Sequence, residues 1–594
     1  TSLRPSLNLS GNRHMKILTI LSCGIFSTVI LATAQQDQAP AESTAVPAFT
    51  LAWSKAEPIK LIGPHATHQL VLTAKSTIGA DHDVTHSAKY GVLPEGIIDI
   101  DPSGFVRAYG DGTATVTATT DGVTAAPFTI SVQGFGKSIP VSFPNDVVPI
   151  FTRFECNSGG CHGKAEGQNS FRLSLLGYES AEDYEYLVKE SRGRRIFRAA
   201  PEHSLLLLKA SGELPHRGGS RLEKDSDAYK LIVRWIQQGL PYAPKDDPSV
   251  TRIAVFPQEC LPRPEARQQL QVTAHFSDGS TRDITRSVQY ESKDDEMAVA
   301  DEHGRVTMKK RTGSTSIMIR FQEHVDVFRA TIPLGAPIDN FPAPTNFIDE
   351  RILAKLKTLG LPPSDLSDEA TFVRRVTLDI AGRLPTLAES DLFLADPDPA
   401  KRAKLIETLL GSPAYADYFA GKWSAILRNK RKDDSQKRGT YAFHSWIRSS
   451  LNDNRPYDEV VRELITATGE VGQSPAVAWY RSVRESKEQM QDVAQVFLGI
   501  RMQCAQCHHH PYEKWSQDDY YGFEAFFSTI GRKPGEQAGE ELIYHKRGNA
   551  KAQNPRSGLS LKPTPLGGKP LELASHQAPR QPLADWLVAP ENPF

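Results

Sequence analysis

The chain contains little cysteine, with six in 594 residues, which is too few for a scaffold built from disulfides. Cys23 lies in a predicted export signal, and Cys260 is predicted to be buried in a β-module, without chemistry. The other four cysteines form two close pairs, each followed at once by a histidine: Cys156, Cys161 and His162; Cys504, Cys507 and His508. Two cysteine pairs that are each followed by a histidine predict two binding sites of the same type.

An excess of charge of either sign is also lacking. Lys and Arg number 69 against 70 Asp and Glu, and a net charge of −1 argues against a nucleic-acid partner. No apolar run after residue 34 reaches the length of about 20 residues that spans a membrane, so we expect no integral membrane span in the mature chain. No P-loop, dinucleotide fingerprint, catalytic triad or paired catalytic carboxylate stands out, so the motifs name no reaction.

Residues 1–34 have the pattern of a secretory signal. Met15 and Lys16 begin a short basic stretch, the run from Ile17 to Leu31 is mostly apolar, and Ala32-Thr33-Ala34 provides a small-residue cleavage site. We therefore predict that Met15 is the true start, that the signal is cleaved, and that the protein is exported to the periplasm or cell surface. An uncleaved anchor or a lipoprotein attached through Cys23 is the alternative.

An internal repeat is displaced by 200 residues. The segment Gln69–Ala74 matches Gln269–Ala274, and Asp83–Tyr90 matches Asp283–Tyr290. Alternating β-branched residues between Gly and Asp turns predict that each copy is an all-β sandwich. The predicted sandwiches span residues 50–135 and 250–335. Such modules serve as spacers or as adhesive domains.

Residues 140–245, between the two copies, contain the first cysteine pair in a C-x-x-x-x-C-H sequence. Two thiols can form thioether bonds to a heme while the next histidine binds its iron, although a disulfide across the Gly-rich turn is the alternative. No methionine occurs between Cys161 and Val250, which excludes a local methionine as sixth ligand. His216, in a Pro- and Gly-containing loop, is the predicted second axial ligand, and His203 is predicted to be a surface residue.

A Pro-rich linker from Pro333 to Phe347 leads into a sequence with apolar residues spaced by three and four. Capping signals at Asp368 and Thr386 mark two helix starts. The predicted helices include Ile348–Leu359, Pro399–Leu410, Ala414–Leu427, Tyr441–Asn452, Tyr457–Thr466 and Lys487–Met502. Residues 345–535 are therefore predicted to be mainly helical.

The second pair has the shorter sequence C-x-x-C-H, which places Cys504 and Cys507 on one helical turn beside His508. In an exported protein this spacing favours covalent heme with His508 as the proximal iron ligand. The alternatives are a disulfide and a tetrahedral zinc site that adds His510. Candidate sixth ligands of the iron are Met490, Met502, His510 and His444, and an open five-coordinate site is equally compatible with the sequence.

Several motifs support a family resemblance. They include Pro215-His216-x-Gly218-Gly219, Arg374–Pro385, Asn454–Asp458 and Phe497–Pro511 with its continuation to Tyr521. With the order of modules, they resemble the secreted planctomycete-type cytochrome c family. That family combines immunoglobulin-like group 2 modules, a planctomycete cytochrome C domain and a helical C-x-x-C-H domain formerly of unknown function. The resemblance implies heme c at both cysteine pairs, and implies that residues 536–594 are a linker and the start of a further, truncated domain.

The sequence thus predicts a multidomain protein: two all-β immunoglobulin-like sandwiches, a small mostly α cytochrome c-like domain between them, and a large mainly α C-terminal domain. The leading functional hypothesis is an exported diheme c-type cytochrome whose iron carries electrons for oxidative chemistry on polymers at the cell surface. Alternatives are a diheme peroxidase- or oxidase-like enzyme and a heme-free adhesion or binding protein. A surface polysaccharide or envelope component is a candidate partner, and the sequence names no redox partner.

Overall fold

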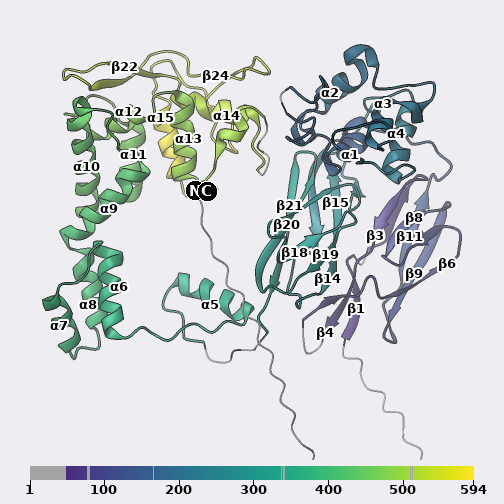
Figure 1. Cartoon of the computed structure of the whole chain (residues 1–594), viewed down its shortest axis with the longest axis horizontal. Helices are drawn as coiled ribbons and strands as arrows, with labels where there is room; N and C mark the ends of the chain where they lie inside the picture. Colours follow the sequence, from purple (N-terminus) through teal and green to yellow (C-terminus); the bar gives the residue numbers. More distant parts are fainter. Residues whose placement is uncertain are drawn as a thin grey trace, which may run out of the picture. The chain divides into compact units, whose positions relative to one another are not determined.

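The computed structural model describes residues 49–594 apart from residues 56, 77–79, 165, 336–337, 339–340, 509 and 511–512. The predicted signal at residues 1–34, with Met15 and Cys23, lies outside the described residues. β-Sheets dominate the N-terminal half of the described part, and helices dominate the C-terminal region (Figure 1). None of the helices in the described part is both long and apolar enough to cross a membrane.

The first β-rich segment, here called β-module 1, contains eleven short strands in three sheets. The sheets have the orders β1-β4-β5, β10-β9-β11-β2 with β6 paired to β9, and β3-β8-β7. The strands are β1 Phe49–Trp53, β2 Ile59–Ile62, β3 Thr67–Gln69, β4 Leu72–Ser76, β5 His82–Asp83, β6 Lys89–Leu93, β7 Ile98–Ile100, β8 Phe105–Ala108, β9 Gly112–Thr120, β10 Val123–Thr124 and β11 Phe128–Gln133.

The second β-rich segment, β-module 2, has the same order of sheets: β12-β15-β16, β13-β21-β20-β17 and β14-β19-β18. Its strands are β12 Val250–Phe256, β13 Glu259–Cys260, β14 Arg267–Gln269, β15 Gln271–Phe276, β16 Thr281–Asp283, β17 Gln289–Ser292, β18 Ala298–Ala300, β19 Arg305–Met308, β20 Gly313–Phe321 and β21 His324–Ile332. Both modules include one parallel pair, β2 with β11 and β13 with β21. The repeat seen in the sequence is therefore a repeat of strand topology.

Alternation of small apolar and threonine residues explains the long strand β9. Ala114, Val116 and Ala118 are buried, and the threonines between them are more exposed. The period of two matches a pleated strand with one face on a core. Cys260, which the sequence predicts to be buried, is half-buried and packs against the core of β-module 2.

The two β-modules contact each other through equivalent residues. The backbone N–H of Gln69 donates to Asp283 at 3.2 Å, and the backbone N–H of Gln269 donates to Asp83 at 2.8 Å. Each glutamine therefore pairs with the other module's copy of the same aspartate, which is the reciprocity of a two-fold interface.

Residues 140–245 form a mostly helical segment between the β-modules. Its helices are η1 Phe143–Val147, α1 Val148–Arg153, η2 Leu175–Gly177, α2 Ser180–Tyr184, η3 Glu185–Lys189, η4 Glu190–Gly193, η5 Pro201–His203, α3 Leu205–Ala210 and α4 Asp227–Gln237. On α4, Ile232, Trp235 and Ile236 are buried and pack with Phe143 of η1 in one hydrophobic core. The apolar face of this helix is thus the face that the segment buries.

A side chain caps the N-terminal end of α4, and its contribution to the stability of this helix can be tested. The Ser226 hydroxyl accepts a hydrogen bond from the backbone N–H of Tyr229 at 3.2 Å and so caps the helix. We expect Ser226→Ala to destabilise α4 by about 1 kcal/mol, because the first turn loses its acceptor. Hydrogen exchange of peptides covering α4 should speed up by about fivefold. Ser249→Ala, at an exposed position outside any helix, should leave exchange in α4 unchanged, and equal effects of both variants would contradict the capping role.

The C-terminal region begins with a long series of helices. They are α5 Phe347–Leu359, α6 Glu369–Ala381, α7 Leu387–Ala395, α8 Lys401–Leu410, α9 Pro413–Ile426, η6 Asp434–Gln436, α10 Lys437–Asn452, α11 Tyr457–Thr466, η7 Pro475–Ala478, α12 Trp479–Ser482, α13 Ser486–Phe497, η8 Met502–Gln506, α14 Gln517–Glu524 and η9 Ala525–Phe527. Asp368 and Thr386 cap α6 and α7, as their sequence signals predict.

The helix before the second cysteine pair is shorter than predicted. α13 ends at Phe497 and does not continue to Met502. Gly499 has a φ of +73°, a left-handed backbone that ends a helix, and a separate 3-10 turn then carries Cys504. The cysteines are therefore presented by a tight loop and not by the end of a long helix.

Residues after Phe527 form short strands and a last helix. The strands are β22 Ile530–Pro534, β23 Glu541–His545, β24 Ala552–Gln553 and β25 Ser560–Leu561, and the helix is α15 Arg580–Leu587. Leu583 and Ala584 of α15 are buried in the same hydrophobic core as α11 and α13. The segment 536–594, which the sequence presents as a linker and the start of a further domain, thus packs on the helical region.

Candidate functional site

The first cysteine pair lies in a loop that folds back on itself directly after α1. The backbone N–H of His162 donates to the carbonyl of Cys156 at 3.0 Å, and that of Cys161 donates to the carbonyl of Ser158 at 3.0 Å. A side chain at Gly163 would approach the Asn157 carbonyl oxygen to 2.0 Å, so this position requires glycine. These contacts bring the backbone of Cys161 and His162 back to that of Cys156 and Ser158.

His216 faces this loop from a separate segment of the chain. The imidazoles of His162 and His216 have nearly parallel planes, 7° apart, and their ring centroids are separated by 6.3 Å. His162 Nδ1 lies 2.8 Å from the carbonyl oxygen of Phe171, and His216 Nδ1 lies 2.9 Å from that of Gly219. Both rings are thus fixed through Nδ1, which leaves Nε2 of each as the nitrogen available for a metal.

The spacing of the two imidazoles fits a metal ion shared between them. A centroid separation of 6.3 Å also lies within the range of ordinary contacts between aromatic rings. Two metal–nitrogen bonds of about 2 Å each, with the radius of each ring, add up to roughly this separation. The separation of the two rings is therefore compatible with an iron held by both histidines.

The cysteines themselves are free thiols, and none of the five described cysteines is in a disulfide. Burial raises the pKa of the Cys156 thiol to about 12. A protonated, buried thiol is a poor zinc ligand and a poor nucleophile, because both roles need the thiolate.

His203, at the end of η5, is exposed, in agreement with its prediction as a surface residue. No sequence signal points to the carbonyl partners of the two imidazoles. Phe171 and Gly219 act through backbone oxygens, which any residue carries, so only the fold identifies them.

The second cysteine pair lies on η8 and the residue that follows it. Cys504 is half-buried and Cys507 is exposed. The carbonyl oxygen of Gln506, between them, accepts hydrogen bonds from Gln517 Nε2 at 2.9 Å and from the Tyr521 hydroxyl at 3.1 Å. α14 therefore fixes the loop that presents Cys507 and His508.

The candidate sixth ligands of this second site are already engaged or buried. Met490 and Met502 are fully buried in the core of the helical region. His510 Nε2 lies 3.1 Å from the carbonyl oxygen of Arg501, and burial lowers the pKa of this imidazole. His444 is half-buried on α10. No described residue is thus placed as a second axial ligand in the way that His216 is placed at the first pair.

Within the described residues, no three His, Cys, Asp or Glu side chains gather in a metal-binding group. The donor set at the second pair, two thiols on one turn and one adjacent imidazole, fits covalent heme attachment.

The helical region around the second cysteine pair matches a known family of domains. Residues 347–532 match PSCyt2, described as a protein of unknown function (DUF1549). The PSCyt2 match covers the helices from α5 to α14 and includes Cys504, Cys507 and His508. This relates the region to a planctomycete-cytochrome family of domains. No curated protein matches the chain.

The solved structures that match this chain are similar to it only at low sequence identity and low TM-score. The S-layer protein rSbsC(31-844) is 13% identical over 54% of this chain and 32% of its own, with a TM-score of 0.14. Domains 5-6 of S-layer protein SbsC are 10% identical over 48% of this chain and 97% of theirs, with a TM-score of 0.20. Invasin, a bacterial integrin-binding protein, is 13% identical over 48% and 59%, with a TM-score of 0.11. This chain spans about a third of the length of the first of them.

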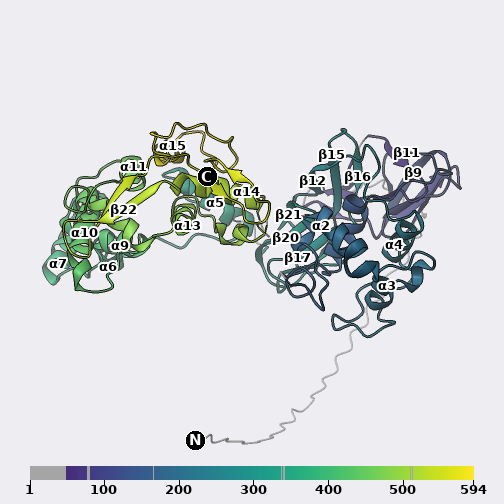
Figure 2. The same cartoon turned by 90° about the horizontal axis from the view of Figure 1, so that it is seen from above.

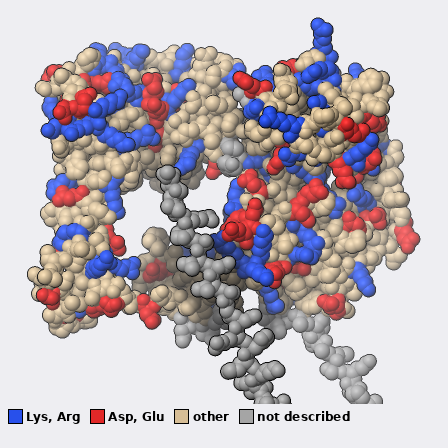
Figure 3. All heavy atoms as spheres, viewed as in Figure 1, with Lys and Arg blue, Asp and Glu red and all other residues tan. Residues whose placement is uncertain are grey.

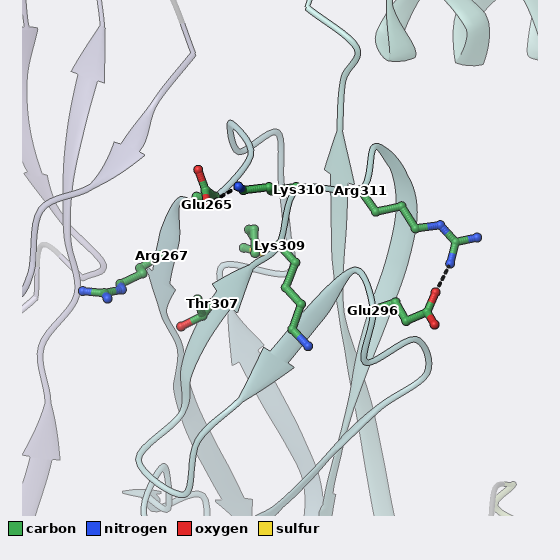
Figure 4. Close-up of a pocket in the computed structure, with 8 residues that line it drawn as sticks. Glu265, Arg267, Glu296, Thr307, Lys309, Lys310 and Arg311 are labelled. Carbon is green, nitrogen blue, oxygen red and sulfur yellow. Dashed lines mark hydrogen bonds and ion pairs between the residues drawn. The ribbon is translucent and has the colours of Figure 1, made fainter. Parts of the chain in front are cut away.

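A surface hollow of about 660 Å³ on β-module 2 is also rich in charge (Figure 4). Lys310 pairs with Glu265, and Arg311 pairs with Glu296. Figure 4 shows Arg267 and Arg311 pointing to opposite sides of the hollow. Because its cations diverge and half of them are paired, this hollow is poorly shaped for a single anionic group.

Proposed function

We propose that this protein is an exported c-type cytochrome with two covalently attached hemes, one at each cysteine pair. The observation that carries the proposal is the nearly parallel pair of imidazoles, His162 and His216, whose ring centroids are 6.3 Å apart and of which His162 directly follows Cys161 in the chain. The resemblance to secreted planctomycete-type proteins, with immunoglobulin-like modules flanking a cytochrome-like segment, supports the same assignment. Heme c bound at these residues would supply one-electron transfer through its iron.

The chain's own residues would set the properties of the first heme. Backbone carbonyls hold both imidazoles in one tautomer, with Nδ1–H donating and Nε2 free for the iron. The apolar core around Trp235 and Phe151 would exclude water from one side of the site. Two neutral nitrogen ligands favour a low-spin iron that changes little on gaining an electron, which suits electron transfer better than binding of a substrate.

A pyridine hemochrome assay tests the proposal. The chain from Gln35 would be exported in a host with the c-type maturation machinery, beside Cys156→Ala/Cys161→Ala and Cys504→Ala/Cys507→Ala. We expect two covalent hemes per wild-type chain and one in each double variant, because each heme depends on its own pair of thiols. Wild-type protein without covalent heme would overturn the proposal and favour a surface adhesion or binding protein.

A second candidate function, a peroxidase- or oxidase-like activity, concerns the second site alone. It is favoured by the contact of His510 Nε2 with the Arg501 carbonyl and by the burial of Met490 and Met502 in the helical core, since these three candidate sixth ligands are engaged elsewhere. An enzyme of this kind needs an open position on the iron. Carbon monoxide or cyanide should then perturb one of the two heme spectra, and no effect on either heme would remove this candidate.

A further inference from the structure

Two cationic side chains adjoin the paired imidazoles of His162 and His216. Arg195 is only 5% exposed, and Lys209 is half-buried on α3. Both views show α3 close to α2 and α4 in this segment (Figures 1 and 2). Within the described part of the chain, neither cation forms an ion pair with a carboxylate. Buried charges are normally paired, so an unpaired one beside a candidate metal site is a functional candidate.

Arg195 is held in place by backbone carbonyl groups. Its Nη1 donates to Tyr186 at 2.8 Å and to Glu190 at 3.2 Å, and its Nη2 donates to Ser170 at 3.0 Å. Neutral carbonyl oxygens satisfy these N–H groups without cancelling the charge. Burial lowers the pKa of Arg195, and the charges of Glu190 and Arg194 act on it in opposite directions. Because arginine stays protonated in proteins, the segment carries a permanent buried positive charge here.

Phe171 connects this charge to the first cysteine pair. The guanidinium carbon of Arg195 lies 4.4 Å from the centre of the Phe171 ring, and the ring centroids of Phe171 and His162 are 4.6 Å apart. The carbonyl oxygen of Phe171 is also the group that fixes His162 Nδ1. An apolar ring screens a charge far less than water does, so the field of Arg195 acts strongly at the imidazole.

Lys209 stands in a similar position beside the other imidazole. Its Nζ donates to the carbonyl oxygen of Pro215 at 3.4 Å, and Pro215 directly precedes His216. The carboxylate of Glu213, in the same loop, is paired with Lys224 at 3.1 Å. Each imidazole of the pair therefore has one cation close to it.

The carboxylates around the cysteine loop do not offset these two cations. Glu155 is paired with Arg221 at 3.1 Å. Glu166 is exposed to water, and so is Lys164 two residues before it. Figure 3 shows basic and acidic side chains interspersed over the face in view, so that face has no large patch of one sign. The surroundings of the two imidazoles are therefore positive.

We propose that Arg195 and Lys209 raise the reduction potential of an iron held by His162 and His216. This inference rests on the proposed function, and it concerns side chains that surround the ligands. In the reduction, an external reductant gives one electron, ferric iron becomes ferrous, and no bond forms or breaks. Nearby cations favour the reduced site, because it carries one positive charge less. The first heme thus accepts electrons from weaker reductants than two imidazole ligands alone would allow.

Spectroelectrochemical titration of the heme-loaded full chain tests the inference. We expect Arg195→Gln to make reduction of the first heme about tenfold less favourable, or about 59 mV for one electron. One charge at roughly 10 Å, with an effective dielectric constant of about 20, has an effect of this size. Arg195→Lys should keep most of the wild-type potential, because it keeps the charge while losing hydrogen bonds to the carbonyls. A merely structural role would disturb both variants alike.

Lys209→Gln should lower the potential by a smaller amount that shrinks as salt is added, because water and ions screen a half-buried charge. The matched control is Lys230→Gln, which removes one exposed cation from α4 of the same segment and should leave the potential unchanged. Cys504→Ala/Cys507→Ala, with only the first heme, assigns the two potentials. If Arg195→Gln takes up no heme, Lys209→Gln at low salt decides the outcome.

Three results would overturn the inference alone. They are an unchanged potential in heme-loaded Arg195→Gln and Lys209→Gln, an equal shift in Arg195→Lys and Arg195→Gln, and an equal shift in the control Lys230→Gln. The first result would show that the cations do not act on the iron, the second that Arg195 acts through the fold, and the third that only net charge matters. A wild-type chain without heme at the first pair would overturn the proposed function, and this inference with it.

Discussion

Replacing His216 by alanine should convert one of the two hemes from low spin to high spin. The parallel imidazole of His216 is the group that completes a pair of strong-field nitrogen ligands with His162. Its removal leaves the first iron with a single protein ligand, while the second heme keeps its spectrum. Absorption and electron paramagnetic resonance spectra of heme-loaded protein should therefore show about half of the iron changed, because one of two sites is affected.

His203→Ala is the matched control, because His203 lies in the same segment and is exposed. Its spectrum should equal that of the wild type. An unchanged spectrum in His216→Ala would refute the ligand assignment, since no local methionine could take over. Imidazole added to His216→Ala should restore the low-spin spectrum, which a merely structural role of His216 would not allow.

The buried carboxyl of Asp183 should make the segment 140–245 less stable as the pH rises. Asp183 is fully buried on α2 and accepts hydrogen bonds from the backbone N–H and the hydroxyl of Ser174. Burial raises its pKa from 3.8 to about 7, despite these hydrogen bonds, which act in the opposite direction. The folded segment thus binds a proton more tightly than the unfolded chain does.

The sign of the effect follows from this raised pKa. The stabilising contribution of the neutral carboxyl is fully present below about pH 4 and is lost as the pH rises through about 7. Over that interval the free energy of unfolding should fall by up to about 4 kcal/mol. Asp183→Asn mimics the neutral carboxyl. The free energy of unfolding of this variant should be close to that of the wild type at pH 5 and higher than that of the wild type at pH 8.

Hydrogen exchange of peptides covering residues 174–186, corrected for the intrinsic pH dependence, measures this difference locally. The control is Asp225→Asn, at an exposed position in the same segment, which should keep the wild-type pH dependence. A pH dependence that persists in Asp183→Asn would show that another group titrates.

Local sequence signals predicted the elements that depend on local chemistry. The alternation in β9 and the caps at Asp368 and Thr386 act within one strand or one helical turn, so the printed sequence was sufficient. The repeat was readable because its turn residues recur at a fixed offset. The end of α13 was missed because apolar spacing continues to Ile500, and only the left-handed backbone at Gly499 stops the helix.

Features of the candidate sites that depend on long-range contacts were harder to predict from the sequence. The pairing of His216 with His162 could be proposed by elimination of methionine, but the carbonyls that hold the rings come from distant backbone. Arg195 and His162 both contact Phe171, and no sequence motif connects these three residues. Such sites depend on how separate elements pack, and a single sequence carries no local pattern for that packing.

The reciprocal hydrogen bonds between the β-modules have a consequence for the segment inserted between them. These hydrogen bonds join the two β-modules, through Gln69 with Asp283 and through Gln269 with Asp83. The two ends of the segment between the modules are therefore held close to each other. Two separate chains with such an interface would separate on dilution, whereas partners in one chain meet at an effective concentration in the millimolar range. The inserted segment can therefore unfold and refold, for instance while a cofactor is being attached, without the frame around it coming apart.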